Sequence, residues 1–292
     1  IAKIPVSCEL ASEYHYRDPV TSGVNTAIAI SQSGESLDTL KAINFASKRD
    51  LSTIALVNVL DSTIAREADL ILATKAGPEV GVASTKAFTA QLTVLISLTI
   101  AIAEAKGQLT EHQSEKLQDQ IKLLPGLVGK ALESFDSIRP IANDLKSSKS
   151  ALFLGRGYLF PIALEGALKL KELSYIHAEG FAAGEMKHGP IALIEDNLPV
   201  IGLLANDNLV DKVISNLKEA NDRGGKIILI ADEELVPSID FASYVVTVPK
   251  ADPLLSPILF TIPIQILAYL TALDKGTDVD QPRNLAKSVT VE

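Results

Sequence analysis

The stretch TAIAISQSGESLDTL, residues 26–40, decides the fold. It opens with an apolar run at residues 26–30, which has the composition of a strand buried in a parallel sheet. A helical pattern begins at Leu37 and continues to Lys48. Between them, residues 31–36 replace apolar side chains with hydroxyls, an amide and a glycine. A buried strand that passes directly into a helix through such a loop indicates a layered α/β fold.

The loop SQSGES at residues 31–36 carries the donors of an oxyanion site. The N-terminus of the following helix supplies unpaired N–H groups and the positive end of its dipole. Serine and glutamine side chains add further donors, and Gly34 allows the backbone to approach a ligand closely. Phosphate is the expected ligand. The alternative is a serine-rich helix cap that binds nothing, because serine is common at caps, and six residues alone leave both interpretations open.

Strand and helix patterns alternate through most of the chain, which predicts parallel α/β layers. IALVNVLDSTIAREADLILAT at residues 54–74 and IILIADEELVPSIDFASYVVTV at residues 227–248 share one order of strand, acidic loop and strand. We interpret this as two tandem copies of an open, mainly parallel sheet flanked by helices, of the flavodoxin-like three-layer kind. The first copy is expected at residues 1–147 and the second at 148–280, with the boundary at the polar SSKS, and residues 281–292 form a tail.

The pattern also predicts the individual elements. Strands are expected at residues 27–30, 53–57, 70–73, 151–154, 199–204, 226–230 and 244–248, and helices at 37–48, 84–105, 111–124, 128–145, 159–176, 209–223 and 257–273. Residues 177–190 have little periodicity and are expected to form a loop or a broken helix. In the second copy, ANDN at residues 205–208 replaces the serine loop, and its Asp207 would repel phosphate. One phosphate site per chain is therefore expected, in the first copy.

The composition narrows the class of partner. A formal charge of −9 over 292 residues, with no run rich in Lys or Arg, argues against nucleic acid or an anionic membrane as the main partner. The apolar stretch at residues 92–103 contains Thr and Ser and is shorter than a bilayer span, and no secretory signal pattern opens the chain. The single cysteine, Cys8, excludes an internal disulfide and suits a reducing compartment, and we expect it to be a small core residue. A cytoplasmic fragment of a longer protein is predicted.

A second group of polar side chains follows in the other half. Glu165, Lys169 and Glu172 stand at i, i+4 and i+7, so they share one face of a helix. The alternative is a solvated face with ordinary ion pairs. The segment HAEGFAAGEMKHGP, residues 177–190, contains two of the four histidines, and loops with clustered titratable groups are typical of active sites. The histidines are far apart and no zinc-ligand spacing occurs, so neither a metal nor a cofactor is expected.

Four segments together resemble one enzyme family. SQSGESLDTL, GVASTKAF, EGALKLKELSYIHAEGFAAGEMKHGPIALI and QPRNLAKSVTVE are similar to the C-terminal isomerase half of the glutamine–fructose-6-phosphate transaminases, also called glucosamine-6-phosphate synthases. The resemblance runs from residue 4 to residue 292, and the long motif at residues 169–190 is specific. It implies two tandem sugar-isomerase (SIS) domains, which agrees with the internal duplication. It also implies the conversion of fructose 6-phosphate and ammonia into glucosamine 6-phosphate, the first step of hexosamine synthesis.

The resemblance implies a substrate-binding set and a catalytic set. The sugar phosphate would contact Ser31, Gln32, Ser33, Ser36, Val82, Ser84 and the backbone of Ala286. Glu172 would move a proton between C1 and C2, and Lys169 would assist at the C1 hydroxyl. Lys287 would form a Schiff base with the ketose carbonyl. His188 would open the furanose ring and would come from the neighbouring subunit of a homodimer. Taken alone, however, the tail that carries Lys287 could equally be a frayed end.

Two parts of the family pattern are missing from these residues. The glutaminase domain, whose N-terminal cysteine releases ammonia from glutamine, is expected as a partner in the full-length protein, since Cys8 cannot replace it. The family also has a Cys-Gly-Thr-Ser segment upstream of the region equivalent to residue 1, so an incomplete sheet and phosphate site are expected.

Two alternative functions stay open. One is a sugar-phosphate sensor module, like the SIS modules of transcriptional regulators, although Glu172, His188 and Lys287 are all present. The other is a deglycase of phosphorylated fructosamines, against which the tail motif PRNLAKSVTVE speaks.

Overall fold

The structure is a computed structural model that describes residues 1–288, and the chain divides into two compact units. The first unit comprises residues 1–115 and the tail from Asn284, and the second comprises residues 116–283. The boundary expected at residues 147/148 falls inside the second unit, because α6 (Phe135–Leu145) packs against α9 (Ser256–Lys275) there. The last four residues of the expected tail, 289–292, lie outside the described part of the chain.

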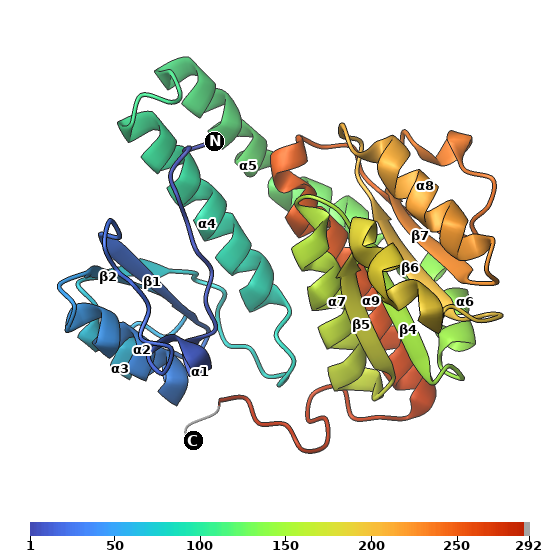
Figure 1. Cartoon of the computed structure of the whole chain (residues 1–292), viewed down its shortest axis with the longest axis horizontal. Helices are drawn as coiled ribbons and strands as arrows, with labels where there is room; N and C mark the ends of the chain where they lie inside the picture. Colours follow the sequence, from blue (N-terminus) through green and yellow to red (C-terminus); the bar gives the residue numbers. More distant parts are fainter. Residues whose placement is uncertain (289–292) are drawn as a thin grey trace. The chain divides into compact units, whose positions relative to one another are not determined.

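The first unit has a parallel sheet in the order β1-β2-β3, covered on one face by α2 and α3 (Figure 1). Small and branched apolar residues form its core, among them Ile43 on α2 and Val57 on β2. On the other face Ile28 and Ile30 remain 40% and 45% exposed. The elements are α1 (Ala11–Tyr14), β1 (Thr26–Ser31), α2 (Leu37–Ser47), β2 (Ser52–Val57), α3 (Thr63–Glu67), β3 (Leu70–Ala73) and α4 (Lys86–Ala105).

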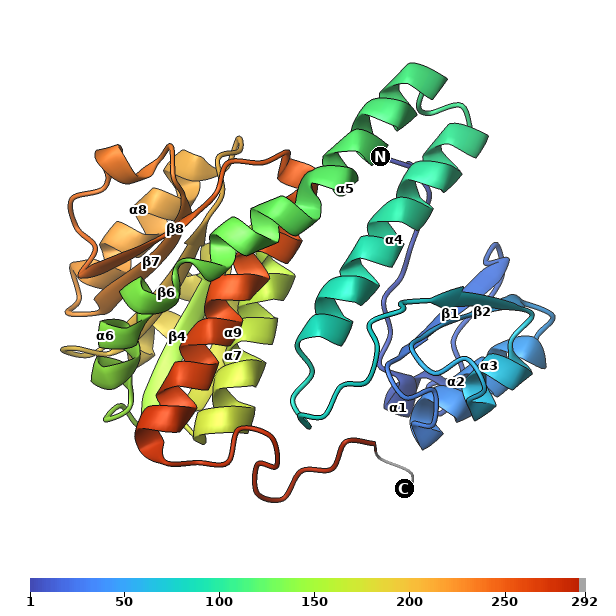
Figure 2. The same cartoon turned by 180° about the vertical axis from the view of Figure 1, so that it is seen from behind.

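The second unit has a five-stranded parallel sheet in the order β5-β4-β6-β7-β8. Helices α6, α7 and α9 cover one face and α8 the other, as Figures 1 and 2 show, so the three layers expected from the sequence are present. The elements are α5 (Glu111–Leu132, which begins in the first unit), α6, β4 (Ser150–Gly155), α7 (Leu159–Ser174), β5 (His177–Ala182), η1 (Ala183–His188), η2 (Pro190–Leu193), β6 (Pro199–Leu204), α8 (Val210–Asn221), β7 (Lys226–Asp232), η3 (Val236–Ser238), β8 (Tyr244–Val248), η4 (Pro253–Leu255) and α9.

The two sheets share one internal order. In each unit three consecutive parallel strands lie side by side, β1-β2-β3 in the first and β6-β7-β8 in the second. The SQSGES loop follows β1 and the ANDN loop follows β6, at matching positions. The duplication inferred from the sequence pattern is therefore visible in the strand order, and the serine loop occurs in one of the two copies.

Three sequence predictions are wrong in detail. A loop or a broken helix was expected over residues 177–190, but residues 177–182 form the edge strand β5 and the short helix η1 follows at residues 183–188; the strand lacks a strand-like pattern because Gly180 lies directly beneath α7. Helix α5 continues through Pro125, where a break was expected, because the buried Leu124 and Ala131 extend one apolar face across it. Cys8 is exposed and not part of the core, since residues 1–10 form no helix or strand.

Within residues 1–288, two helices are long and apolar enough, by length and composition alone, to cross a membrane. They correspond to α4 and to residues 253–275, whereas the sequence analysis expected no stretch of sufficient length. The second is 78% buried, as expected for the core helix of a globular protein, which passes the same test, whereas only 17% of the first is buried. These two helices are weak evidence for a membrane segment. The absence of a membrane span, expected from the sequence, stays a prediction.

Candidate active site

The SQSGES loop folds around the side chain of its first serine. The hydroxyl oxygen of the buried Ser31 accepts the N–H of Gly34 at 3.0 Å and lies 3.5 Å from the hydroxyl of Ser36. Gly34 adopts a left-handed conformation with φ +67°, which turns the chain into α2. Ser36 occupies the N-cap position, yet its side chain makes no capping hydrogen bond. The Ser36 hydroxyl is therefore not used as an ordinary helix cap. The hydroxyls of Ser31 and Ser33 accept the N–H groups of Gly34 and Glu35 and can still donate, which favours the ligand-binding interpretation of this loop.

The carboxylate of the loop is engaged elsewhere. Glu35 Oε1 accepts the backbone N–H of Thr63 at 2.7 Å, where α3 begins. This hydrogen bond is the main cause of the lowered pKa of Glu35. The negative charge is thus held at the start of α3, which reduces its conflict with an anion at the loop.

The tail docks on the first unit through a buried carboxylate that the sequence analysis missed. The side chain of Glu79 is 4% exposed. Lys287 donates from Nζ to Glu79 Oε2 and to the carbonyl of Gly81, each at 2.7 Å. Near the serine loop, the hydroxyls of Ser33 and Ser288 lie 3.2 Å apart. The described end of the tail is therefore held at both of these points and is not frayed.

The same carboxylate organises the turn before α4. Ser84 donates its hydroxyl to Glu79 Oε2 at 3.2 Å, while Oε1 accepts the backbone N–H groups of Thr85 and Ala87 at 2.9 and 3.1 Å. Burial alone would raise the pKa of Glu79, but the hydrogen bonds from Lys287 and the two backbone amides outweigh it and lower that pKa. The one signal for Glu79 in the sequence is its position just before a predicted helix, as a carboxylate next to Gly, Val, Ala and Ser residues.

The second unit assembles the charged face of α7 as expected. Lys169 Nζ lies 2.5 Å from Glu172 Oε2 and 3.6 Å from Glu165 Oε1. The side chain of Lys169 is 4% exposed and that of Glu172 is 21% exposed, so these are not the solvated ion pairs of the alternative interpretation. Burying an ammonium between two carboxylates costs folding free energy, and such buried charged groups are frequent in active sites.

Two glycines set the position of this helix. A Cβ at Gly166 would lie 2.7 Å from the ring of Phe153 on β4, and a Cβ at Gly180 would lie 2.8 Å from the carbonyl oxygen of Ala163. Both close approaches are open to glycine alone. They bring α7 against the sheet and fix the height at which Glu172 is presented.

Glu165 is the carboxylate of this group whose burial is least compensated by hydrogen bonds. Its Oε1 makes no hydrogen bond to any described residue. Burial raises the pKa of Glu165 to about 7; the ammonium of Lys169 opposes this rise and the charge of Glu172 adds to it. The sequence analysis placed Glu165 on this face but gave it no role.

We expect Glu165→Gln to change the pH dependence of stability. Between pH 4.5 and about 7 the folded chain retains a proton that the unfolded chain releases, so the free energy of unfolding falls as the pH rises through this window. The amide removes this loss, so above pH 7 the variant should be more stable than the parent by on the order of 2 kcal/mol, and at pH 5 nearly equal. Urea unfolding at pH 5 and 8 measures this, with exposed Glu133→Gln as the matched control; equal pH slopes would contradict it.

The remaining predicted residues lie in separate places. Val82 is half-buried in the turn that Glu79 organises, Ala286 is exposed in the docked tail, and the carbonyl of Gln32 accepts the N–H of Asn58 at 3.1 Å. His188 is exposed at the end of η1 in the second unit. No hydrogen bond joins His188 to Lys169 or Glu172 within residues 1–288, and its role in ring opening stays a prediction.

Comparison with known proteins identifies the family. The SIS domain family matches residues 1–101 and 144–274. The solved C-terminal domain of glucosamine-fructose-6-phosphate aminotransferase from Francisella tularensis is 45% identical and superposes with a TM-score of 0.94, covering 96% of this chain and 79% of that chain. The chain belongs to the SIS family, in its aminotransferase group.

The relatives of this SIS chain are longer than the chain itself. The glutamine–fructose-6-phosphate aminotransferase (isomerizing) of Zymomonas mobilis is 52% identical over 292 residues, which are the whole of this chain and 48% of the relative. The chain thus spans about half the length of the curated relatives it matches. A more distant solved structure, glucosamine-6-phosphate deaminase from Thermotoga maritima, is 26% identical with a TM-score of 0.74, covering 96% of this chain and 80% of that chain. The family resemblance and fold class predicted from the sequence are confirmed.

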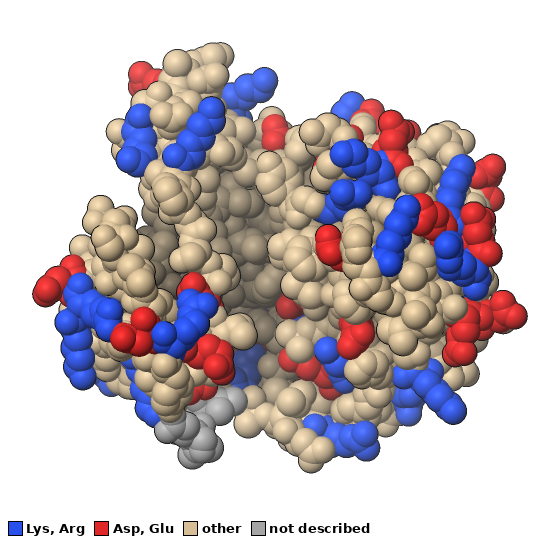
Figure 3. All heavy atoms as spheres, in the orientation of Figure 1, with Lys and Arg blue, Asp and Glu red and all other residues tan. Residues whose placement is uncertain are grey.

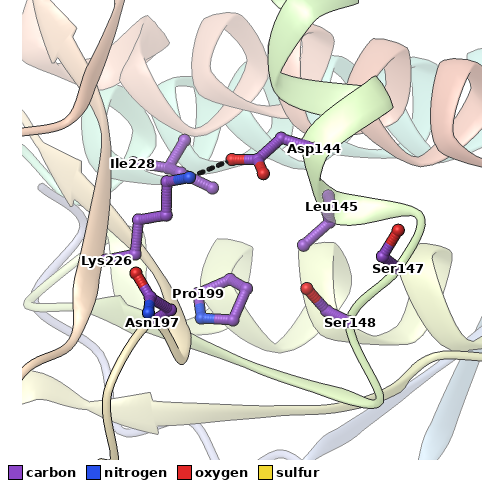
Figure 4. Close-up of a pocket in the computed structure, with 8 residues that line it drawn as sticks. All are labelled: Asp144, Leu145, Ser147, Ser148, Asn197, Pro199, Lys226 and Ile228. Atoms are coloured by element: carbon purple, nitrogen blue, oxygen red, sulfur yellow. Dashed lines mark hydrogen bonds and ion pairs between the residues drawn. The ribbon is translucent and has the colours of Figure 1, made fainter.

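A pocket in the second unit is lined by none of the predicted site residues. It has a volume of about 250 Å³ and opens between α6 and the amino ends of β6 and β7, where Lys226 pairs with Asp144 (Figure 4). Ligands of open parallel sheets bind at the carboxyl ends of the strands, so we assign this pocket no role in the chemistry. Over the face of this unit in Figure 3, acidic and basic side chains are interspersed. No metal-binding group of three or more His, Cys, Asp or Glu occurs among residues 1–288.

Proposed function

We propose that this chain is the isomerase half of a glucosamine-6-phosphate synthase. It would bind fructose 6-phosphate and, with ammonia released from glutamine by a glutaminase domain, form glucosamine 6-phosphate. The observation that carries the proposal is the docked tail of the first unit. There Lys287 is held next to the turn with Val82 and Ser84, while Ser288 contacts the serine loop. The same short tail thus positions an amine, which can react with a carbonyl, and contacts a loop that can bind phosphate. This combination suits a substrate with both a carbonyl and a phosphate group.

In the proposed reaction the phosphate binds to the hydroxyls and amides at Ser31, Gln32, Ser33 and Ser36. Lys287 attacks the C2 carbonyl and forms an imine, and ammonia then displaces the lysine. Glu172 removes a proton from C1 and delivers it to C2, which converts the ketose imine into the amino aldose. Lys169, in contact with Glu172, would donate to the C1 hydroxyl. The buried position of this pair supports a positioned acid–base group.

The proposal includes a homodimer. His188 is exposed at the end of η1 and is followed by Gly189, which has a positive φ of +148°, so the histidine is available to a neighbouring subunit. We propose that it opens the furanose ring in the partner's site, and that the protein works in the cytoplasm. In this proposal the dimer brings a histidine to the site of Glu172, where His188 of the same chain makes no hydrogen bond to Glu172 within residues 1–288.

Imine trapping tests the proposal. The chain is mixed with fructose 6-phosphate and borohydride, and the labelled peptide is located by mass spectrometry. We expect one sugar-phosphate adduct on Lys287 and its loss in Lys287→Arg, because the guanidinium stays protonated and cannot attack a carbonyl. Lys275→Arg, outside the tail, is the control. A label on another lysine, or none, would rule out this assignment.

A second candidate function is the reverse type of chemistry, removal of the amino group from an amino sugar phosphate. The structural similarity to the Thermotoga maritima deaminase favours it over a pure sensor. Ammonia release from glucosamine 6-phosphate that exceeds aldose formation from fructose 6-phosphate would support this candidate.

A further inference from the structure

We propose that Glu79 is a positioning residue for Lys287 that also accepts the proton this lysine must lose before it attacks the substrate. This inference rests on the proposed function and adds a member to that site. It arises from the part-buried contact between a carboxylate in the loop before α4 and a lysine 208 residues further along the chain.

The two oxygens of Glu79 have different partners. Oε1 accepts the backbone N–H groups of Thr85 and Ala87, which fixes the carboxylate relative to α4. Oε2 accepts from Lys287 Nζ at 2.7 Å and from the hydroxyl of Ser84 at 3.2 Å. A simple helix cap needs the first oxygen alone. The second oxygen faces the amine, and its geometry is what a proton acceptor requires.

A lysine side chain ordinarily carries an ammonium group, and an ammonium cannot attack a carbonyl. An ammonium has no free electron pair, so Lys287 has to release a proton before its nitrogen bonds to a carbonyl carbon. Among the described residues, the carboxylate in contact with Nζ is Glu79, and its other contact there is the Gly81 carbonyl, which cannot accept the proton. Glu79 is also shielded from water, so the proton remains in the site.

The proton balance closes with these two residues and the sugar. Lys287 passes one proton from its ammonium to Oε2 of Glu79, and the neutral amine bonds to C2. Glu79 returns that proton to the former carbonyl oxygen. A second nitrogen proton follows through the same carboxylate as water leaves, so the iminium keeps one of the three original protons and Glu79 ends ionised.

The decisive variant is Glu79→Gln, which preserves shape and can keep the α4 cap through its amide oxygen, while its NH₂ group faces Lys287. At saturating fructose 6-phosphate, the rate of borohydride trapping should fall by about 100-fold, the contribution typical of a general base. The dissociation constant for fructose 6-phosphate should change by less than about threefold, because the hydrogen bonds of Glu79 within residues 1–288 go to the turn before α4 and to Lys287, and none goes to the serine loop. Glu79→Asp should recover part of the rate.

Three outcomes decide the matter. Glu104→Gln, a matched exchange at a carboxylate that accepts from Ser114 in the first unit, should trap at the parental rate. Glu79→Gln trapping at the parental rate would overturn the proposal. So would a slower variant whose affinity and melting temperature fall together and which Glu79→Asp does not rescue, because that pattern marks a purely structural cap. Absence of any adduct on Lys287 in the parent chain would instead reject the proposed function itself.

Discussion

Replacing Glu172 by glutamine is expected to slow the conversion of fructose 6-phosphate to an aldose phosphate by about 100- to 10,000-fold. General acid–base groups contribute rate factors of this size, and an amide can neither take the C1 proton nor return it to C2. The structure supports the assignment because Glu172 is the partly exposed end of a buried group, with Lys169 Nζ 2.5 Å from its Oε2. Aldose phosphate formation, followed with a coupled dehydrogenase, measures the effect.

The control separates chemistry from folding. Glu234→Gln removes a carboxylate that pairs with Lys250 at 2.7 Å on the surface of the same unit, and its activity should equal that of the parent. Glu172→Gln should still form the borohydride-trapped adduct on Lys287, because imine formation precedes the C1–C2 proton transfer. A Glu172→Gln chain that isomerises at the parental rate would remove Glu172 from the mechanism.

Replacing Gly34 by alanine is expected to weaken binding of fructose 6-phosphate by at least about tenfold and to destabilise the first unit by about 2–5 kcal/mol. The left-handed φ of +67° costs an alanine about 1–2 kcal/mol, and forcing an extra methyl into a packed site costs a further 1–3 kcal/mol. The new Cβ would lie 1.9 Å from Ser62 Oγ, so the serine loop has to move. Isothermal titration and urea unfolding measure the two effects.

Gly77 provides the matched control for this variant. It has nearly the same conformation, with φ +69°, but a Cβ there would meet nothing within 4 Å. Gly77→Ala should therefore show the conformational cost alone and leave the affinity for fructose 6-phosphate unchanged. If the two alanine variants bind equally well, the serine loop does not hold the phosphate.

The features predicted from the sequence are those specified by neighbouring residues. Apolar runs such as residues 199–204 and 244–248 marked strands at their observed bounds, and every residue of the first run is buried, as expected for a central strand of a parallel sheet. Strand β5 was missed for the opposite reason. Position 180 requires glycine because α7 packs too closely for a side chain, and a glycine gives no strand-like signal in the sequence.

The site divides in the same way. The i, i+4, i+7 spacing was sufficient to group Glu165, Lys169 and Glu172, since helix geometry alone places them together. The spacing could not indicate that Glu165 is buried enough to shift its pKa. Glu79 was invisible because its importance lies in a contact with a residue near the other end of the chain, and pattern analysis reports local order only.

The tail of the first unit has a consequence for how the protein is made. Ser33 and Ser288 are 255 residues apart, and residues 116–283, which form the whole second unit, are translated between Glu79 and Lys287. At about 5–20 residues per second, the ribosome needs on the order of 10 s for that interval. During this time the nascent chain carries the serine loop and the carboxylate but no lysine to complete them. The amine that we propose forms the imine is thus added after both of these groups, so a chain halted before residue 287 is expected to give no borohydride-trapped adduct.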